Sequence, residues 1–168
     1  MVNIPYNRSA AVAYAHKWAY DRNRAYYDFS DIGGDCTNFA SQCIYAGCGI
    51  MNYTPTFGWY YINSGNRSPS WSGVDFLHNF LVKNTSVGPY AMETSVENIM
   101  PGDIIQLKLE PSYDSFQHSP IVVEVGNPVN IDNILVAAHS FDADFRPLNT
   151  YDWLAIRFLH ILGARKWS

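Results

Sequence analysis

The sequence predicts an α+β fold, with helices in the first half of the chain and an antiparallel sheet in the second. Before residue 100, apolar residues recur with the spacing of amphipathic helices, and after it the apolar pattern changes to a period of two. Short turns and loops join the expected strands, which favours antiparallel neighbours. Helices that precede strands in this way are typical of an α+β plan, so we expect them to pack on one face of the sheet.

Three helices are expected. The first covers about residues 7–27, where apolar residues form a stripe and charged residues lie largely off it. The second runs from Cys36 to about Ala46, and Gly47 stands where it would end. The third begins at Ser72, where the run Ser72-Gly73-Val74-Asp75 resembles a capping box. The helix that begins at Cys36 has an apolar face and should be central and largely buried.

Four strands are expected after residue 100. They cover residues 104–109, 118–125, 134–139 and 153–162, and the turn Pro101-Gly102-Asp103 precedes the first. Pro120 lies within the second strand. Because proline has no N–H group for a ladder, we expect that strand at a sheet edge or with a bulge.

Residues 47–70 are expected to form a long loop, because Gly, Asn, Pro and Ser recur there without a sustained period. The loop carries Trp59, Tyr60 and Tyr61. Long irregular loops in compact domains are often functional, so Trp59 and Tyr60 are candidates for a substrate-binding wall. The alternative is that these rings pin the loop to the core. The sequence leaves both interpretations open.

The composition bounds the class of protein. The 168 residues fit one domain, 1–168, with a net charge of −4 and no basic run, which argues against nucleic-acid binding. No apolar run approaches the roughly 20 residues of a transmembrane helix. No signal peptide is visible, so we expect either a cytoplasmic protein or one domain of a longer secreted chain. We expect a monomer or a domain of a larger chain.

Cys36 is the candidate nucleophile. The run Gly33-Gly34-Asp35 gives a sharp turn and an N-cap, and Cys36 then occupies the first helical position. The helix dipole and the unpaired N–H groups at that end favour a thiolate, which is the nucleophilic form of cysteine. Cys43 and Cys48 are expected to be small buried hydrophobic residues.

A cysteine nucleophile needs a base, and five histidines are available. His16 and His78 lie within expected helices and are assigned structural roles. His118 opens one expected strand and His139 closes the next, so antiparallel pairing would bring them together. His118 would then be the base and His139 the group that orients it. Asp142 and Asp144 are rivals for that third position, and the sequence does not choose among the three.

A metal site is the main chemical alternative. Zinc ligands usually include close pairs such as CxxC or HxxxH, and the chain has neither. Cys36, His118 and His139 are therefore assigned to catalysis, and no metal or cofactor is expected.

Several segments, in order along the chain, resemble one known family. The ten residues from Gly33 to Gln42, GGDCTNFASQ, resemble the signature of the "Putative amidase domain" family of Gram-positive bacteria, which is related to the NlpC/P60 and CHAP cysteine peptidases. The further matching segments are Tyr14-Ala15, Asn23–Tyr27, Trp59–Tyr61, Ser70-Trp71, Pro101–Ile105, His118–Val123 and His139–Asp142. Cys48 departs from the family pattern, which commonly has glycine there.

The resemblance implies a papain-like core of the NlpC/P60 type, with the cysteine helix packed on a sheet that bears the histidine. It implies that Cys36 is the nucleophile, His118 the base and His139 the third polar residue. The implied activity is that of a cysteine amidase or peptidase, a hydrolase whose substrate is an amide bond in cell-wall peptidoglycan peptide.

Two alternatives remain at this stage. The aromatic loop is also compatible with an inactive cell-wall-binding module of the same fold. The missing signal peptide is compatible with an intracellular amidase or acyltransferase that acts on small molecules. For a cell-wall function we expect the protein to be secreted or associated with the cell wall, as part of a longer precursor. A cytoplasmic location is also left open.

Overall fold

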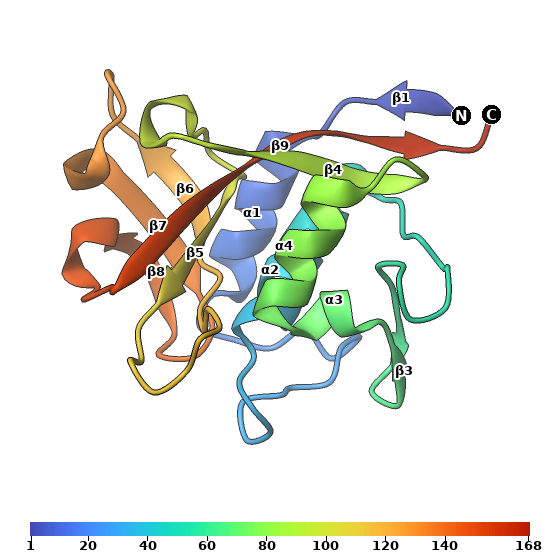
Figure 1. Ribbon diagram of the computed structural model, residues 1–168, viewed down its shortest axis with the longest axis horizontal. Coiled ribbons are helices and arrows are strands. Elements are labelled where there is room, and N and C mark those ends of the chain that lie inside the picture. The colour runs from blue at the N-terminus through green and yellow to red at the C-terminus, as the bar shows by residue number, and fades with distance from the viewer.

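A seven-stranded antiparallel sheet and four helices make up the protein (Figure 1). The computed structural model describes residues 1–168. The strands follow the order β1-β9-β5-β6-β7-β8. The seventh strand, β4, is outside this linear order and also pairs with β9. Their bounds are β1 Val2–Ile4, β4 Gly88–Thr94, β5 Ile104–Lys108, β6 Ile121–Val125, β7 Ile134–Ala138, β8 Ala143–Pro147 and β9 Ala155–Lys166. A separate hairpin pairs β2 (Tyr61–Asn63) with β3 (Asn66–Arg67).

The helices are α1 (Arg8–Trp18), α2 (Cys36–Cys48), α3 (Pro69–Ser72) and α4 (Val74–Lys83). Short 3₁₀ turns cover η1 Val96–Asn98, η2 Ile131–Asn133 and η3 Leu148–Thr150. In Figure 1 the two chain ends lie side by side, because β1 pairs with the last residues of β9. None of the helices has the length and apolar character needed to span a bilayer.

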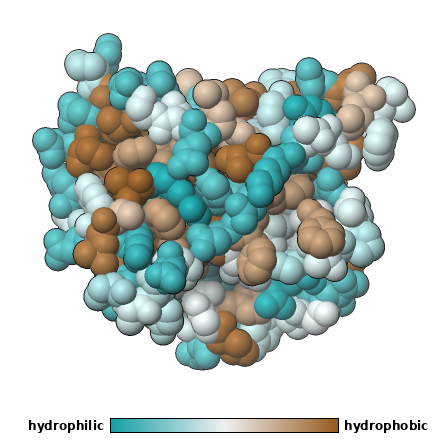
Figure 2. All heavy atoms as spheres, viewed as in Figure 1, coloured by the Kyte–Doolittle hydropathy of each residue, from teal (hydrophilic) through white to brown (hydrophobic).

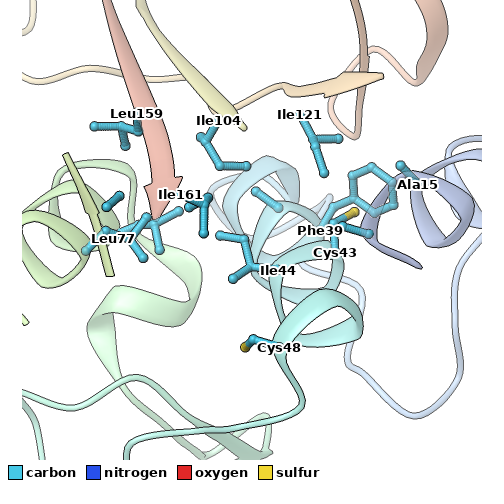
Figure 3. Packing of buried hydrophobic residues seen from close by; sticks show 14 of the residues in the cluster. Ala15, Phe39, Cys43, Ile44, Cys48, Leu77, Ile104, Ile121, Leu159 and Ile161 are labelled. Carbon is cyan, nitrogen blue, oxygen red and sulfur yellow. The ribbon is translucent and has the colours of Figure 1, made fainter. Parts of the chain in front are cut away.

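Helix α2 is the centre of the core. Eleven of its thirteen residues are buried, as expected for a helix covered on several sides. In Figure 3, Phe39 and Cys43 of α2 lie beside Ala15 of α1, and Ile44 lies near Ile161 of β9. Because neighbours surround α2, its first residue is held in a fixed position.

Asp35 occupies the N-cap position of α2 as expected, but its side chain makes no capping hydrogen bond. Gly49 ends the helix in the left-handed conformation with φ of 68°. Gly47, which the sequence suggested as the end, lies inside the helix. A Cβ there would come within 2.3 Å of the Tyr6 ring, so this glycine permits close packing rather than a helix stop.

The sheet is covered on both faces. Side chains along its strands point alternately into two hydrophobic clusters. The first contains the buried residues of α2 together with Ile121, and the second contains Val122. The second cluster also contains Ile105, Leu107 and Tyr151. On the face drawn in Figure 2, polar and apolar side chains are interspersed.

The Pro101-Gly102-Asp103 turn is a structural junction. Gly102 has a φ of +91°, and the fully buried Asp103 carboxylate accepts hydrogen bonds from Arg8 and His160 at 2.8 Å. It also accepts from the backbone N–H groups of Met100 and Ile161. These bonds tie α1, β5 and β9 together at one point.

Several expected boundaries were wrong. The first helix ends at Trp18 rather than near residue 27. No capping box forms at Ser72, because Ser72 ends α3 and Gly73 caps α4 without a side-chain bond. The strand expected from His118 begins at Ile121, after Pro120, and β6 has register shifts between Val122 and Glu124. That strand is internal, since β5 and β7 flank it.

Candidate active site

Cys36 is the first residue of α2 and lies against the segment that precedes β6. Its Sγ is 3.6 Å from the carbonyl oxygen of Gln117, the residue next to His118, and 3.7 Å from Thr37 Oγ1. The side chain is buried, with 7% of the residue exposed. The fold therefore brings the predicted nucleophile and the predicted base into one neighbourhood.

The resting thiol does not follow the expectation of a thiolate. Burial raises the pKa of Cys36 above its usual value, although hydrogen bonds from Thr37 and from the Ser119 N–H lower it. A helix N-terminus contributes up to about 2 kcal/mol, or about 1.5 pKa units. Full burial shifts a pKa by up to about 3–5 units. Burial is therefore the larger effect, and Cys36 rests as a neutral thiol.

His118 rests as a neutral imidazole. Burial, with the positive charge of Arg146 adding to it, lowers the pKa of His118 from 6.5 to about 4. Its backbone is fixed by two hydrogen bonds with Leu107 of β5. Its Nε2 lies 3.4 Å from the hydroxyl of Tyr151, and no protein group is hydrogen-bonded to Nδ1. A neutral imidazole with one nitrogen unengaged can accept a proton.

A chain of buried polar side chains holds the start of α2 against the His118 segment. Thr37 Oγ1 lies 3.1 Å from Ser119 Oγ, which also accepts a hydrogen bond from Gln106 Nε2 at 3.2 Å. Arg157 Nε donates to Gln106 Oε1 at 2.8 Å. Because Thr37 follows Cys36 and Ser119 follows His118, this chain fixes the relative placement of the two candidate catalytic residues.

His139 does not lie against His118. Its Nδ1 is 2.5 Å from Asp35 Oδ2, its Nε2 is 2.7 Å from the Trp18 carbonyl oxygen, and its ring stacks on Phe39. The sheet register explains the difference. Ile121 pairs with Ala137, and the same register places His139 opposite Ser119 rather than His118. The expected His118–His139 contact is therefore replaced by a His139–Asp35 contact.

The two aspartates considered for the third position are also engaged elsewhere. Asp142 accepts two hydrogen bonds from Arg22, at 2.9 and 3.0 Å. Asp144 pairs with His16 at 2.8 Å. Neither carboxylate orients His118 in this structure. The side chain that touches His118 is Tyr151. No local pattern singles out Tyr151, because it follows an unpatterned loop and its contact depends on long-range packing.

Asp35 anchors the start of α2. The carboxylate is 1% exposed and accepts hydrogen bonds from the Phe29 N–H and from Asn38 Nδ2, besides its contact with His139. These contacts join the 20–35 loop, α2 and the end of β7 directly beside Cys36.

Replacing Asp35 by alanine is expected to lower the free energy of unfolding by about 3 kcal/mol or more, because three buried polar partners lose their acceptor. Urea unfolding followed by tryptophan fluorescence measures it. Asp114, which is exposed and makes no hydrogen bond, supplies the control variant Asp114→Ala. Equal stabilities of the two variants would contradict the anchoring role.

Trp59 and Tyr60 are not a substrate wall in this structure. Trp59 is fully buried, its Nε1 donates to Ser41 Oγ at 3.1 Å, and its ring packs 4.7 Å from that of Trp71. Tyr60 is 9% exposed. The aromatic residues therefore pin the long loop to α2, which is the packing alternative considered from the sequence.

A cavity of about 540 Å³ opens between α4 and the 52–58 loop, away from Cys36. Phe57, Phe76 and Lys83 are among its lining residues, and neither Cys36 nor His118 is. No cysteine or histidine is among the residues that line it. No cluster of three or more His, Cys, Asp or Glu side chains is arranged to hold a metal ion.

These features define an α+β protein with a buried cysteine–histidine site between a helix N-terminus and a sheet. A family model described as "Putative amidase domain" matches residues 5–162. The chain belongs to this family, whose description indicates a hydrolase that acts on amide bonds.

One curated relative is similar over most of the chain. It is the uncharacterized protein YhbB of Bacillus subtilis (strain 168), which is 37% identical over 146 residues. The match covers 84% of this chain and 43% of the relative, so the chain spans less than half of that protein. No solved structure matches the chain.

Proposed function

We propose that the chain hydrolyses amide bonds with Cys36 as the nucleophile and His118 as the general base. One observation carries this proposal: the Cys36 Sγ, at the start of α2, packs against the residue that precedes His118. A nucleophile beside a base at a helix N-terminus is the arrangement that acyl transfer through a cysteine requires.

The proposed reaction starts from a neutral pair. His118 Nδ1 takes the thiol proton as Sγ attacks the carbonyl carbon of the amide. The backbone N–H groups of Cys36 and Thr37, which have no helical acceptor at the start of α2, stabilise the developing oxyanion. His118 then gives its proton to the leaving amine. Water, deprotonated by His118, hydrolyses the thioester and regenerates the thiol.

The proposed fold class is a papain-like core of the NlpC/P60 type. Its support is the packing of the nucleophile helix on an antiparallel sheet whose strand β6 follows His118. The proposed substrate is a peptide of cell-wall peptidoglycan, supported by the resemblance of the GGDCTNFASQ motif. We place the chain at the cell wall as part of a longer protein, in keeping with the greater length of its Bacillus relative.

A second candidate function has a specific observation in its favour. Cys36 and His118 are only 7% and 5% exposed, whereas the cavity beside α4 is open and carries the exposed rings of Phe57 and Phe76. A wall-binding module without catalysis would need only such an open surface. The two functions can be told apart because only the hydrolase releases soluble products from the wall.

The deciding experiment incubates the purified chain with insoluble peptidoglycan. The hydrolase is expected to release soluble fragments with new amino and carboxyl ends, read by mass spectrometry and by an amine-reactive dye. Release should stop when iodoacetamide has modified Cys36. Sedimentation of the chain with the wall, without any soluble product, would overturn the hydrolase proposal and favour the binding module.

A further inference from the structure

We propose that Tyr151 is the positioning residue of His118, and that its hydroxyl oxygen accepts a hydrogen bond from Nε2–H of the imidazole. This assigns Tyr151 the place that the sequence had suggested for His139. The inference rests on the proposed function for its catalytic meaning, whereas the contact itself can be tested without any substrate.

The contact lies in a protected environment. Tyr151 Oη is 3.4 Å from His118 Nε2, the ring centroids are 5.4 Å apart, and both residues are under 10% exposed. Tyr151 closes the turn η3 with a backbone bond from its N–H to the Leu148 carbonyl oxygen. It also belongs to the second core cluster, which contains Leu107, the residue whose backbone is hydrogen-bonded to that of His118. The ring and the histidine therefore share one rigid support.

The contact selects the useful tautomer. A neutral imidazole carries one proton, on either Nδ1 or Nε2, and the partner of one nitrogen decides which. If Tyr151 accepts from Nε2–H, Nδ1 keeps its lone pair and can take the Cys36 proton. The imidazolium formed in that step still donates from Nε2 to the same oxygen. The geometry of the ring is thus unchanged through the proton transfer.

Arg146 packs against the ring of Tyr151. Its guanidinium lies 3.6 Å from the centroid of the Tyr151 ring, a distance that gives a cation–π contact. The guanidinium is itself held by Thr150, through bonds to Oγ1 at 2.8 Å and to the carbonyl oxygen at 3.3 Å. Its positive charge also disfavours an imidazolium at His118, which keeps the base neutral before the substrate arrives.

His139 lacks the geometry for this role. Its two ring nitrogens face Asp35 and the Trp18 carbonyl oxygen. Since Asp35 directly precedes α2, these contacts position the start of that helix and not the ring of His118. Each histidine therefore has its own oxygen partner: Asp35 for His139 and Tyr151 for His118.

The direct test is the ¹⁵N NMR spectrum of the histidine side chains in the full chain at pH 7. We expect His118 to carry its proton on Nε2 in the wild type. In Tyr151→Phe, which removes only the oxygen, His118 should become a mixture of both tautomers. Tyr53→Phe is the control, because Tyr53 is exposed and its hydroxyl makes no hydrogen bond. An Nδ1–H tautomer in the wild type, or an unchanged spectrum in Tyr151→Phe, would overturn the inference.

Kinetics then separate positioning from folding. Tyr151→Phe should lower kcat about tenfold, the effect of one hydrogen bond of ordinary strength, with KM unchanged and the fold intact by circular dichroism. Tyr53→Phe should keep the wild-type kcat. A wild-type kcat in Tyr151→Phe would contradict the positioning role. Full activity in a variant that lacks Cys36 would instead overturn the proposed function, while the NMR spectra would still decide the role of Tyr151.

Discussion

Replacing Cys36 by alanine is expected to reduce amide hydrolysis by about 10⁴-fold or more, the scale found when a covalent nucleophile is removed. No other side chain at the site can form the thioester. The measurement is the release of soluble fragments from peptidoglycan at pH 7. Circular dichroism should show an intact fold, because the lost side chain is small and lies at the end of the core.

Cys48→Ala is the matched control for this variant. Cys48 is on the same helix, buried to a similar degree, but about 18 Å further along it. The control is expected to keep wild-type activity. If Cys36→Ala stayed as active as Cys48→Ala, a cysteine mechanism at the start of α2 would be excluded.

Replacing His118 by glutamine is expected to slow hydrolysis by roughly 10²–10⁴-fold, which is the usual contribution of a general base. Glutamine has an amide in a similar place but cannot take up the thiol proton at neutral pH. Because the pKa of His118 is lowered to about 4, kcat/KM of the wild type should hold down to about pH 4 and fall below it. Activity that falls near pH 6.5 instead would contradict a base whose pKa is lowered by burial.

The same variant has a second readout in the pH dependence of stability. The unfolded chain binds a proton on His118 below about pH 6.5, whereas the folded chain does so only below about pH 4. His118 should therefore make the wild type lose about 3 kcal/mol more unfolding free energy than His118→Gln as the pH falls from 6.5 to 4. Urea unfolding should show this loss to be absent in His118→Gln. Equal pH slopes would contradict the burial of a neutral His118.

The elements that carry the chemistry could be predicted because their signals are local. The run from Gly33 to Cys36 marks the start of a helix, and the period of two in 104–109 and 134–139 marks strands. The first expectation is matched by α2, which begins at Cys36, and the others by β5 and β7. These local patterns depend on hydrogen-bonding geometry and on which side of an element is buried.

The contacts between these elements could not be predicted in the same way. A shift of one residue in register exchanges the two faces of a strand, so the partner of His118 depended on whether 118 or 119 faces β7. Tyr151 reaches His118 from a loop 33 residues away. The absence of a period in its loop left open whether Trp59 lines a substrate wall or pins the loop to the core, and the packing against Trp71 decides for the core.

The protonation of the nucleophile also depended on tertiary structure. The helix end alone predicts a thiolate, and the site does have donors around Sγ, from Thr37 and from the Ser119 N–H. The burial that raises the pKa of Cys36 comes from the Gln117 segment and from the surrounding core. A pattern along the sequence predicts where a helix begins, and therefore its dipole, but it does not predict how deeply Cys36 is buried.

Acylation of Cys36 can be read from the mass of the intact protein during reaction with p-nitrophenyl acetate at pH 7. We expect that one acetyl group accumulates, that peptide mapping finds it on Cys36, and that it is absent from Cys36→Ala and forms much more slowly in His118→Gln. Acetyl groups found instead on Cys43, on Cys48 or on surface lysines, at the same rate in all three proteins, would contradict the proposal that Cys36 is the nucleophile.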